Sequence, residues 1–348
     1  MDIETKIELV KRKPTEEIVT EADLLEIFQT YTHPQHYIGF EISGMVHIAA
    51  GLSTALKIND LHKAGCKCMI WLADYHAWIN GKLGGDLELI QKFGEGYFKH
   101  AFVSLGLDED KVEYKLSSKV YDNEFWADTL RIAKDTTINR MMRCTTIMGR
   151  TESDSLPSSA IFYPAMQAAD ILRLNVQIAH AGMDQRKVHM LLREVAPKFN
   201  KKFVAMHTHL LPGLQGPGRM ETELDKKMSK SKPDSSIFLH DSPEEIERKV
   251  KKAHCPPKET KGNPIYEIAE YLILRDRNLK IERPAKFGGD LDVNLEELTK
   301  VYIEEKLHPM DLKNAVAKEL VAMLKPCRDY FEKHSEYMKQ LEQIKITR

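Results

Sequence analysis

Residues 37–73, YIGFEISGMVHIAAGLSTALKINDLHKAGCKCMIWLA, contain the pattern that decides the fold. Residues 37–41 have the short apolar run of a buried strand, and residues 68–73 have another. Between them, apolar side chains recur at helical spacing over 52–61, and Gly65 is typical of the end of a helix. Strand, helix and strand in this order predict two parallel strands joined by a right-handed crossover, with ligands binding beyond the carboxyl ends of the strands.

The same alternation continues as far as about residue 206, and the pattern then changes. From Phe238 onward the sequence shows helical periods and no run of convincing strands. We therefore predict an α/β domain with a parallel sheet over residues 1–236 and a mainly α-helical domain over 237–348. Further strands are expected at 176–180 and 203–206, helices at 22–30, 86–105, 133–150, 161–172 and 185–196, and no clear element at 111–135.

Positive and negative charges almost cancel, with 51 Lys and Arg against 52 Asp and Glu. A net charge of -1 excludes an overall electrostatic footprint for nucleic acid, but it allows local basic clusters. No apolar run approaches the roughly 20 residues that span a bilayer. The first 17 residues alternate acids and bases without an apolar core, which is not the pattern of a secretory signal. We expect a cytoplasmic protein without a membrane partner.

Five cysteines in a chain of 348 residues argue against a disulfide framework. The one close pair, Cys66 and Cys68, has a single residue between its members and opens an apolar strand. Zinc sites usually have two or more residues between such cysteines. We therefore expect no structural metal.

Two junctions between a strand and a helix carry residues that suit a nucleotide. His47 stands where the first helix begins, and a helix N-terminus with an imidazole suits phosphate. Asp184, after Gly182, stands at a second junction, where a carboxylate can take the hydroxyls of a ribose. Each residue alone has an ordinary alternative, because His47 can be a surface or capping residue and Asp184 an N-cap.

Tyr163, Gln167 and Asp170 share one face of the predicted helix because they lie at i, i+4 and i+7. The residues around them are largely apolar. Such a polar stripe forms either a buried structural network or a pocket for a small ligand with an amine and a hydroxyl.

Residues 226–232, KKMSKSK, place four Lys and two Ser in seven positions after a loop rich in Pro and Gly. Ammonium and hydroxyl groups suit a ligand with several phosphate oxygens. The alternative is a solvated surface turn.

The residues at 47–50, His-Ile-Ala-Ala, resemble the "HIGH" signature of class I aminoacyl-tRNA synthetases, and residues 227–231 are the complete "KMSKS" signature. More narrowly, the chain is similar from about Tyr37 to Lys325 to the tyrosyl-tRNA synthetases of the archaeal and eukaryotic type. The segments that carry this similarity are YIGFE at 37–41, YPAMQAAD at 163–170, GMDQRK at 182–187, FGGD at 287–290 and HPMDLKN at 308–314.

This resemblance implies a Rossmann-like catalytic domain, with an insertion for the tRNA acceptor stem near 106–160 and the KMSKS loop at 226–232, followed by a helical anticodon-binding domain. It implies activation of tyrosine with ATP, transfer of the tyrosyl group to tRNA(Tyr), Mg²⁺ accompanying ATP and assembly as a homodimer. Because the attacking carboxylate is already ionised at pH 7, this reaction needs positioned reactants and neutralised phosphate charge but no general base.

The family also implies roles for single residues of the amino-acid site. Tyr37 and Asp170 would hydrogen-bond the phenolic hydroxyl of substrate tyrosine, while Tyr163, Gln167 and Gln185 would hold its α-ammonium group. A site of this kind rejects phenylalanine because its own polar groups are left unpaired, and tyrosyl-tRNA synthetases are the standard example.

For the nucleotide, the family implies that Gly182 and Asp184 take the ribose and that His47, Lys227 and Lys230 are the catalytic residues at the phosphates. The complete set implied for ATP is Gly39, Glu41, His47, Gly182, Asp184, Lys227, Met228 and Lys230.

For tRNA, the family implies that Arg143, Arg186 and Lys187 face the acceptor end and that Phe287 and Asp311 read the anticodon.

The sequence departs from the family signature at two positions, with Ala49 in place of Gly and Ala50 in place of the second His. We expect the loop lysines to compensate for the missing imidazole. Two alternatives stay open at this point: a tryptophanyl-tRNA synthetase on the same fold, and a tRNA-binding protein without catalysis, which Ala50 favours.

Overall fold

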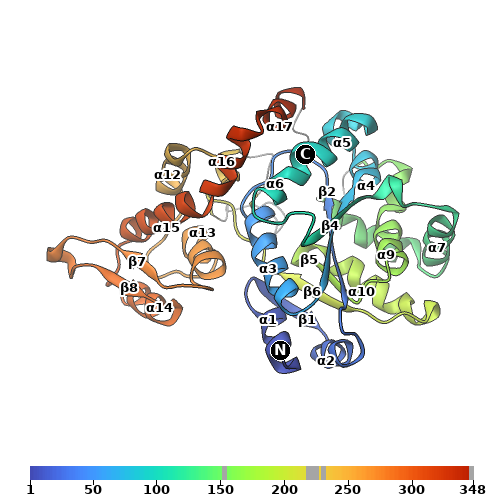
Figure 1. The fold of residues 1–348 in the computed structure, drawn as a ribbon, viewed down its shortest axis with the longest axis horizontal. Coiled ribbons are helices and arrows are strands. Elements are labelled where there is room, and N and C mark those ends of the chain that lie inside the picture. Colours follow the sequence, from blue (N-terminus) through green and yellow to red (C-terminus); the bar gives the residue numbers. More distant parts are fainter. Residues whose placement is uncertain (151–154, 217–226, 229–232, 345–348) are drawn as a thin grey trace.

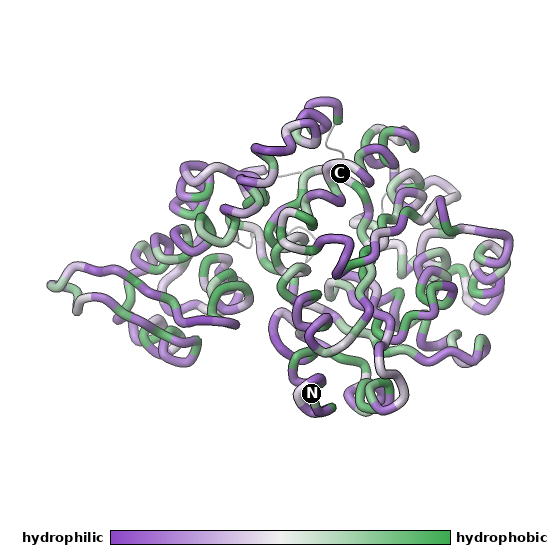
Figure 2. Tube along the Cα trace, in the orientation of Figure 1, coloured by the Kyte–Doolittle hydropathy of each residue, from purple (hydrophilic) through white to green (hydrophobic). Residues whose placement is uncertain are grey.

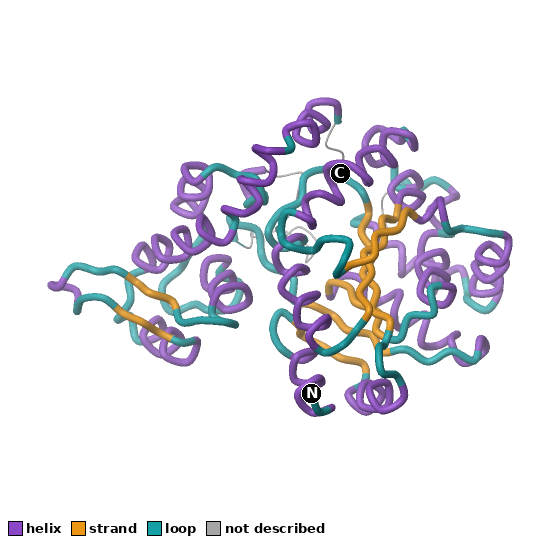
Figure 3. The backbone as a smooth tube through the Cα atoms, viewed as in Figure 1, coloured by secondary structure: helices purple, strands orange, loops and turns teal. Residues whose placement is uncertain are grey.

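The computed structural model describes residues 1–150, 155–216, 227–228 and 233–344. A six-stranded sheet lies at its centre (Figures 1 and 3), and its strands are β1 (Thr15–Val19), β2 (Gln35–Glu41), β3 (Lys67–Ala73), β4 (Val112–Leu116), β5 (Ile178–Gly182) and β6 (Val204–Thr208). The strand order is β1-β6-β5-β2-β3-β4. Strands β2 to β6 pair in parallel, whereas β1 pairs with β6 antiparallel at one edge.

Helices cover both faces of the sheet, as a parallel sheet requires. They are α1 (Ile3–Lys11), α2 (Glu21–Thr30), α3 (Gly51–Lys63), α4 (Asp74–Ile79), α5 (Leu87–Phe93), α6 (Lys99–Val103), α7 (Asn123–Lys134), α8 (Ile138–Cys144), α9 (Tyr163–Arg173) and α10 (Arg186–Val195). Figure 2 shows hydrophobic and hydrophilic stretches alternating along these helices, which is the pattern of elements with one buried face.

The alternation of side chains along the strands divides the core into two clusters. Ile38 and Ile70 belong to the cluster that includes the buried face of α3. Their neighbours Tyr37 and Trp71 point to the opposite face and belong to the cluster that includes α7, α8, α9 and α10. Since successive side chains of a strand alternate between faces, this division follows from the register of β2 with β3. The polar residues of α9 therefore face Tyr37.

The strand order reverses between β2 and β5, which are adjacent in the centre of the sheet. From this point β3 and β4 extend to one side and β6 to the other. A crevice at the carboxyl ends of the strands is expected where the order reverses, and this is where ligands bind in open α/β sheets. The two junctions singled out in the sequence follow β2 and β5.

The C-terminal region is mainly helical, as predicted. It contains α12 (Pro243–Lys252), α13 (Pro264–Ile268), α14 (Leu295–Ile303), α15 (Pro309–Met323), α16 (Lys325–Lys333) and α17 (Ser335–Lys339), together with a small antiparallel pair, β7 (Leu279–Ile281) and β8 (Leu291–Val293). The sequence did not reveal this strand pair. The boundary between residues 236 and 237 stays a prediction.

The end of the chain returns to the α/β part and contacts Tyr97. The side-chain oxygen of Gln340 accepts from the Tyr97 backbone N–H at 2.9 Å, and the ring of Phe331 stacks on that of Tyr97 at 5.5 Å between centroids. The Tyr97 hydroxyl in turn accepts from the backbone N–H of Val46 at 3.2 Å. The C-terminal helices are therefore joined through one buried tyrosine to the turn that carries His47.

Three sequence predictions differ from the structure. The sheet is not entirely parallel, because the charged segment of β1 adds an antiparallel edge strand. The segment 111–135, expected to lack clear structure, contains β4 and α7. The helix predicted over 133–150 is interrupted between α7 and α8, where Thr137 accepts from the backbone N–H of Arg140 as an N-cap. Among the described residues, none of the helices has the length and apolarity to cross a membrane.

Candidate active site

The three polar residues predicted on one helix face lie on the side of α9 that faces the sheet. Tyr163 and Asp170 are only 5% and 1% exposed, and Gln167 is half-buried. The prediction of a shared face is therefore confirmed by the helix α9. What these residues contact decides between a structural network and a pocket.

Tyr37, Gly39 and Glu41 alternate along β2 and so point to the same face of the sheet, toward α9. The buried ring of Tyr37 lies along the strand, so that a Cβ added at Gly39 would overlap the Tyr37 hydroxyl and stand 3.0 Å from its Cζ. Gly39 is thus needed at this position because it makes room for Tyr37. The resemblance assigned Gly39 to ATP, and this contact gives it a second role.

The resemblance implies that Tyr37 binds the hydroxyl of substrate tyrosine, and on that expectation Gly39→Ala should raise the KM for tyrosine about 10- to 100-fold, because the added methyl group displaces the Tyr37 hydroxyl. The KM for ATP should change much less. Steady-state pyrophosphate exchange measures both constants. In a Tyr37→Phe background, Gly39→Ala should raise the KM for tyrosine by a smaller factor than it does alone, since the hydroxyl that it displaces is absent. Strictly additive effects of the two substitutions would contradict this contact.

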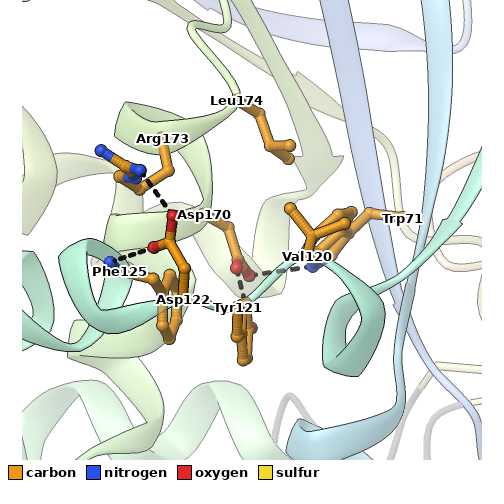
Figure 4. Close-up of a pocket in the computed structure, with 8 residues that line it drawn as sticks. All are labelled: Trp71, Val120, Tyr121, Asp122, Phe125, Asp170, Arg173 and Leu174. Carbon is orange, nitrogen blue, oxygen red and sulfur yellow. Dashed lines mark hydrogen bonds and ion pairs between the residues drawn. The ribbon is translucent and has the colours of Figure 1, made fainter.

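Asp170 is the most buried carboxylate of the site, and two donors from distant segments hold it (Figure 4). Trp71 Nε1 donates to Oδ2 at 3.1 Å, and the Tyr121 hydroxyl donates to Oδ1 at 2.8 Å. Burial raises the pKa of Asp170 well above its usual range, and the two hydrogen bonds act in the opposite direction. Neither donor could be identified from the sequence, because nothing in the local pattern connects Trp71 or Tyr121 with α9.

His76 on α4 is a further residue of the site, and its sequence context gives no sign of this position. Its ring lies edge-on to Tyr163 at 4.5 Å between centroids, and its Nε2 is 4.0 Å from Asp170 Oδ2. Burial lowers the pKa of His76 to about 4, so the ring is neutral at pH 7. Neither ring nitrogen has a hydrogen-bond partner among the described residues. A buried polar ring of this kind beside Asp170 suits contact with a polar ligand.

Glu41 links the end of β2 to Tyr163. It accepts from the Tyr163 hydroxyl at 3.3 Å and from the Asn80 side-chain amide at 2.6 Å, and Lys82 Nζ lies 3.5 Å from its other oxygen. Lys82 is only 6% exposed, so its charge is balanced locally by Glu41. Glu41 therefore fixes the Tyr163 hydroxyl, although the resemblance assigned it to ATP.

Gln167 and Gln185 contact each other across the mouth of the site. The Gln167 amide donates to Gln185 Oε1 at 3.3 Å, and the Gln185 amide donates to the carbonyl oxygen of Ile147 at 3.0 Å. With Tyr163, these side chains bring three acceptor oxygens from α9 and the end of β5 to one place. Acceptor oxygens are what an ammonium group requires.

His47 lies in the turn before α3 and is 8% exposed. The backbone N–H of Ala50 donates to His47 Nδ1 at 3.3 Å, which makes Nδ1 an acceptor and places the proton of the neutral ring on Nε2. A Cβ added at Gly51 would stand 2.8 Å from Leu239, so the small residue here accommodates the segment that follows the Lys-rich loop.

Asp184 contacts the first described lysine of the KMSKS segment. Lys227 Nζ pairs with Asp184 Oδ2, and the Lys227 backbone forms an isolated bridge with Pro212. A Cβ at Gly182 would stand 2.8 Å from Asp184 Oδ1, so this glycine allows the carboxylate to fold back. The helix that follows has no side-chain cap, so the alternative of Asp184 as an N-cap is wrong. Met228 is buried, whereas Lys230 lies outside the described residues.

The residues implied for tRNA divide into two groups. Arg143 is exposed at the end of α8, and Lys187 at the start of α10 donates to Thr146 Oγ1 at 3.0 Å. Arg186 is paired with Glu17 of β1 at 2.7 Å, which lowers the pKa of Glu17. The second group lies in the C-terminal region. It consists of Phe287, which is 61% exposed, and Asp311, in the first turn of α15.

The chain resembles proteins that use tyrosine and tRNA. A family model described as tRNA synthetases class I (W and Y) matches residues 30–325. A tyrosine–tRNA ligase of Thermococcus kodakarensis is 50% identical over 375 aligned positions that cover 100% of each chain. A crystal structure of tyrosyl-tRNA synthetase from Pyrococcus horikoshii, complexed with L-tyrosine, has a TM-score of 0.92 and 46% identity, covering 99% of this chain and 100% of that one. The corresponding structure from Archaeoglobus fulgidus has a TM-score of 0.86 and 40% identity over 94% and 99% of the two chains.

Proposed function

The chain belongs to the class I tRNA synthetases of the tryptophan and tyrosine group, and from this premise we propose that it is a tyrosine–tRNA ligase. It joins the carboxylate of tyrosine to the α-phosphorus of ATP, releases pyrophosphate, and transfers the tyrosyl group to the 3′ end of tRNA(Tyr). The observation that carries this conclusion is the 50% identity to a tyrosine–tRNA ligase over the whole chain. The family inferred from the sequence motifs is thereby confirmed.

The amino-acid site proposed here has a hydroxyl end and an ammonium end. Tyr37 and Asp170 bind the phenolic hydroxyl, because a phenol donates to a carboxylate while a tyrosine hydroxyl donates to its oxygen. Tyr163, Gln167 and Gln185 bind the α-ammonium group. Support comes from the burial of Tyr37 and Asp170, whereas Gln167 and Gln185 are more exposed, so the hydroxyl end of the site is the more deeply buried one.

The nucleotide site proposed here uses both strand-to-helix junctions. Asp184 takes the ribose hydroxyls beside Gly182, and His47 donates from Nε2 to phosphate. Gly39, Glu41 and Met228, the other residues that the family implies for ATP, adjoin these junctions or belong to the KMSKS segment. Lys227 and Lys230 neutralise the charge that develops on pyrophosphate as it leaves. Lysine suits this role because it carries a compact charge on a flexible stem.

Mg²⁺ is proposed to enter with ATP. Within the described ranges no group of three or more His, Cys, Asp or Glu side chains is placed to hold a metal ion. The phosphates of ATP and water would therefore hold the Mg²⁺, which neutralises phosphate charge when bound. The residues of this chain supply the lysine and histidine donors beside it.

Transfer to tRNA is proposed to use the two groups of residues described above. Arg143 lies on α8, and Arg186 and Lys187 begin α10 directly after Gln185 of the amino-acid site, so we propose that the acceptor end enters beside them. Phe287 and Asp311, in the C-terminal region, read the anticodon. A local basic rim on a chain of net charge -1 directs the tRNA to one face.

A homodimer is proposed from an exposed apolar patch formed by Trp78, Trp126 and Leu130. These side chains are 47%, 41% and 59% exposed. The ring of Tyr75 contacts both tryptophan rings, and Leu130 follows Trp126 by one turn of α7. Exposed clusters of this kind mark interaction surfaces, and the family resemblance implies a second copy of the chain as the partner.

We expect sedimentation equilibrium to give a mass of twice 40.0 kDa for the unaltered protein. Trp126→Glu should shift the mass toward 40.0 kDa, because it places a charge in the centre of the apolar patch. Ile303→Glu is the matched control, since Ile303 is 49% exposed at the opposite end of the molecule on α14. Dissociation by the control but not by Trp126→Glu would place the interface elsewhere.

The proposed function is tested by ATP–pyrophosphate exchange with tyrosine, tryptophan and phenylalanine in separate reactions, followed by aminoacylation of tRNA(Tyr). Tyrosine alone should drive rapid exchange and charge the tRNA. Exchange driven only by tryptophan would establish the tryptophan enzyme instead. Binding of tRNA without any exchange would establish a protein that has lost catalysis.

A further inference from the structure

Both carboxylate oxygens of Asp170 already accept one hydrogen bond from a buried or partly buried ring. Trp71, which donates to Oδ2, is fully buried on β3, and Tyr121, which donates to Oδ1, follows β4. A carboxylate can accept about four hydrogen bonds. Two donors thus fix the plane of the group, while each oxygen keeps capacity for a ligand.

The two rings cannot easily follow Asp170 if it moves. Tyr121 is stacked between Phe125, at 3.5 Å between centroids, and Tyr75, at 5.6 Å. Trp71 packs against Tyr121 and against Tyr37, at 6.0 and 6.5 Å. Donors held by packing determine the orientation of the group that they bind.

A cavity of about 100 Å³ adjoins Asp170, and both donors, Trp71 and Tyr121, belong to its lining (Figure 4). Along α9 its lining begins at Asp170 and continues to Arg173 and Leu174, away from Tyr163. Arg173 is paired with Asp122 at 3.0 Å on the wall of this cavity. A buried carboxylate next to such a cavity has two ways to lower its energy: it can take up a proton, or it can turn toward the guanidinium of Arg173.

We propose that Trp71 and Tyr121 are positioning residues for substrate recognition: their hydrogen bonds fix the orientation of the Asp170 carboxylate and favour its charged form. Asp170 then accepts the hydroxyl of the substrate side chain. The inference rests on the proposed function, because it concerns the hydroxyl end of the same amino-acid site.

The electrostatic surroundings of Asp170 agree with this role. Burial raises the pKa of Asp170, and the hydrogen bonds from Tyr121 and Trp71 lower it, so removal of either donor raises it further. More of the carboxyl is then protonated at neutral pH, and a rise in pH restores the charged form. The titratable groups around Asp170 are Tyr37 of β2, Asp74 and His76 of α4, Tyr121 and Asp122 before α7, and Tyr163 and Arg173 of α9.

The experiment compares Tyr121→Phe and Trp71→Phe with the unaltered protein in pyrophosphate exchange from pH 6 to pH 9. Each variant removes one donor and keeps an aromatic ring. We expect the KM for tyrosine to rise about tenfold or more, because a hydrogen bond to a charged group is lost, while kcat and the KM for ATP stay within about twofold. The preference for tyrosine over phenylalanine should fall. The KM for tyrosine should also decrease more steeply with rising pH than in the unaltered protein.

Tyr266→Phe is the matched control, since it deletes a buried hydroxyl that contacts Thr299 at 2.6 Å in the C-terminal region. If both donor variants match this control in KM and pH profile, the inference is wrong. A decrease in kcat together with similar increases in the KM for tyrosine and the KM for ATP would show a general structural role instead. Because the variants remove different donors, either one alone tests the inference if the other does not fold. Failure of the unaltered protein to activate tyrosine would overturn the proposed function itself.

Discussion

Asp170→Asn should lower kcat/KM for tyrosine about 10²- to 10³-fold and leave kcat/KM for phenylalanine almost unchanged. The substitution removes the charged acceptor for the substrate hydroxyl but keeps the shape of the side chain. Trp71 can only donate, so the remaining amide oxygen must face Trp71 Nε1. The amide nitrogen then faces Tyr121, whose hydroxyl can rotate to accept. The fold therefore keeps its hydrogen bonds while the site loses the acceptor that recognises tyrosine.

Pyrophosphate exchange with each amino acid measures this effect, and the KM for ATP should stay within about twofold because Asp170 is proposed to bind the hydroxyl of tyrosine and not the nucleotide. Asp23→Asn is a suitable control, since Asp23 is a largely buried carboxylate paired with Arg193 and Lys202 on the opposite edge of the sheet. Equal activation of tyrosine and phenylalanine by the unaltered protein would remove Asp170 from the recognition of the hydroxyl. An equally large decrease in kcat/KM for tyrosine in Asp23→Asn would also remove Asp170 from the recognition of the hydroxyl.

Lys227→Ala should slow the formation of tyrosyl-adenylate about 10²- to 10³-fold in a single turnover, while the Kd for tyrosine stays within about twofold. Lys227 is paired with Asp184. In the nucleotide site proposed above, the ribose takes Asp184, which would release the Lys227 ammonium group beside the phosphates to stabilise charge that is greatest in the transition state. Loss of such a group affects the rate more than ground-state binding.

Rapid-quench measurement of adenylate at saturating tyrosine and ATP separates these effects. Lys201→Ala is the control, because Lys201 is exposed and its ammonium group donates to the side chain of Asn175 at 2.8 Å. An unchanged single-turnover rate in Lys227→Ala would remove this lysine from the mechanism. Lys230→Ala, at a position outside the described residues, is expected to act in the same direction. Because Ala50 replaces an imidazole of the family signature, both lysines should contribute more than that signature requires.

Most of the parallel sheet could be predicted because each strand has a local apolar run and each crossover helix has its own period. The strand β1 could not, since Thr15–Val19 contains two glutamates and pairs only at the edge of the sheet. The same limit applies to β4 and α7, whose place depends on packing against β3 and α9. Local periodicity predicts a strand or helix correctly where the segment has its own apolar pattern. It fails where the structure of a segment depends mainly on packing against neighbouring elements.

By itself, the sequence determined the two junctions that carry His47 and Asp184, the polar face of α9 and the Lys-rich segment. These are properties of spacing within one segment, so they can be read before any contact is known. Only the tertiary structure decided that Trp71, 99 residues before Asp170, and Tyr121, 49 residues before it, hold its carboxylate. It also decided that Gly39 makes room for Tyr37. The physical reason is that these contacts depend on strand register and on the seating of α9 on the sheet, which no single segment specifies.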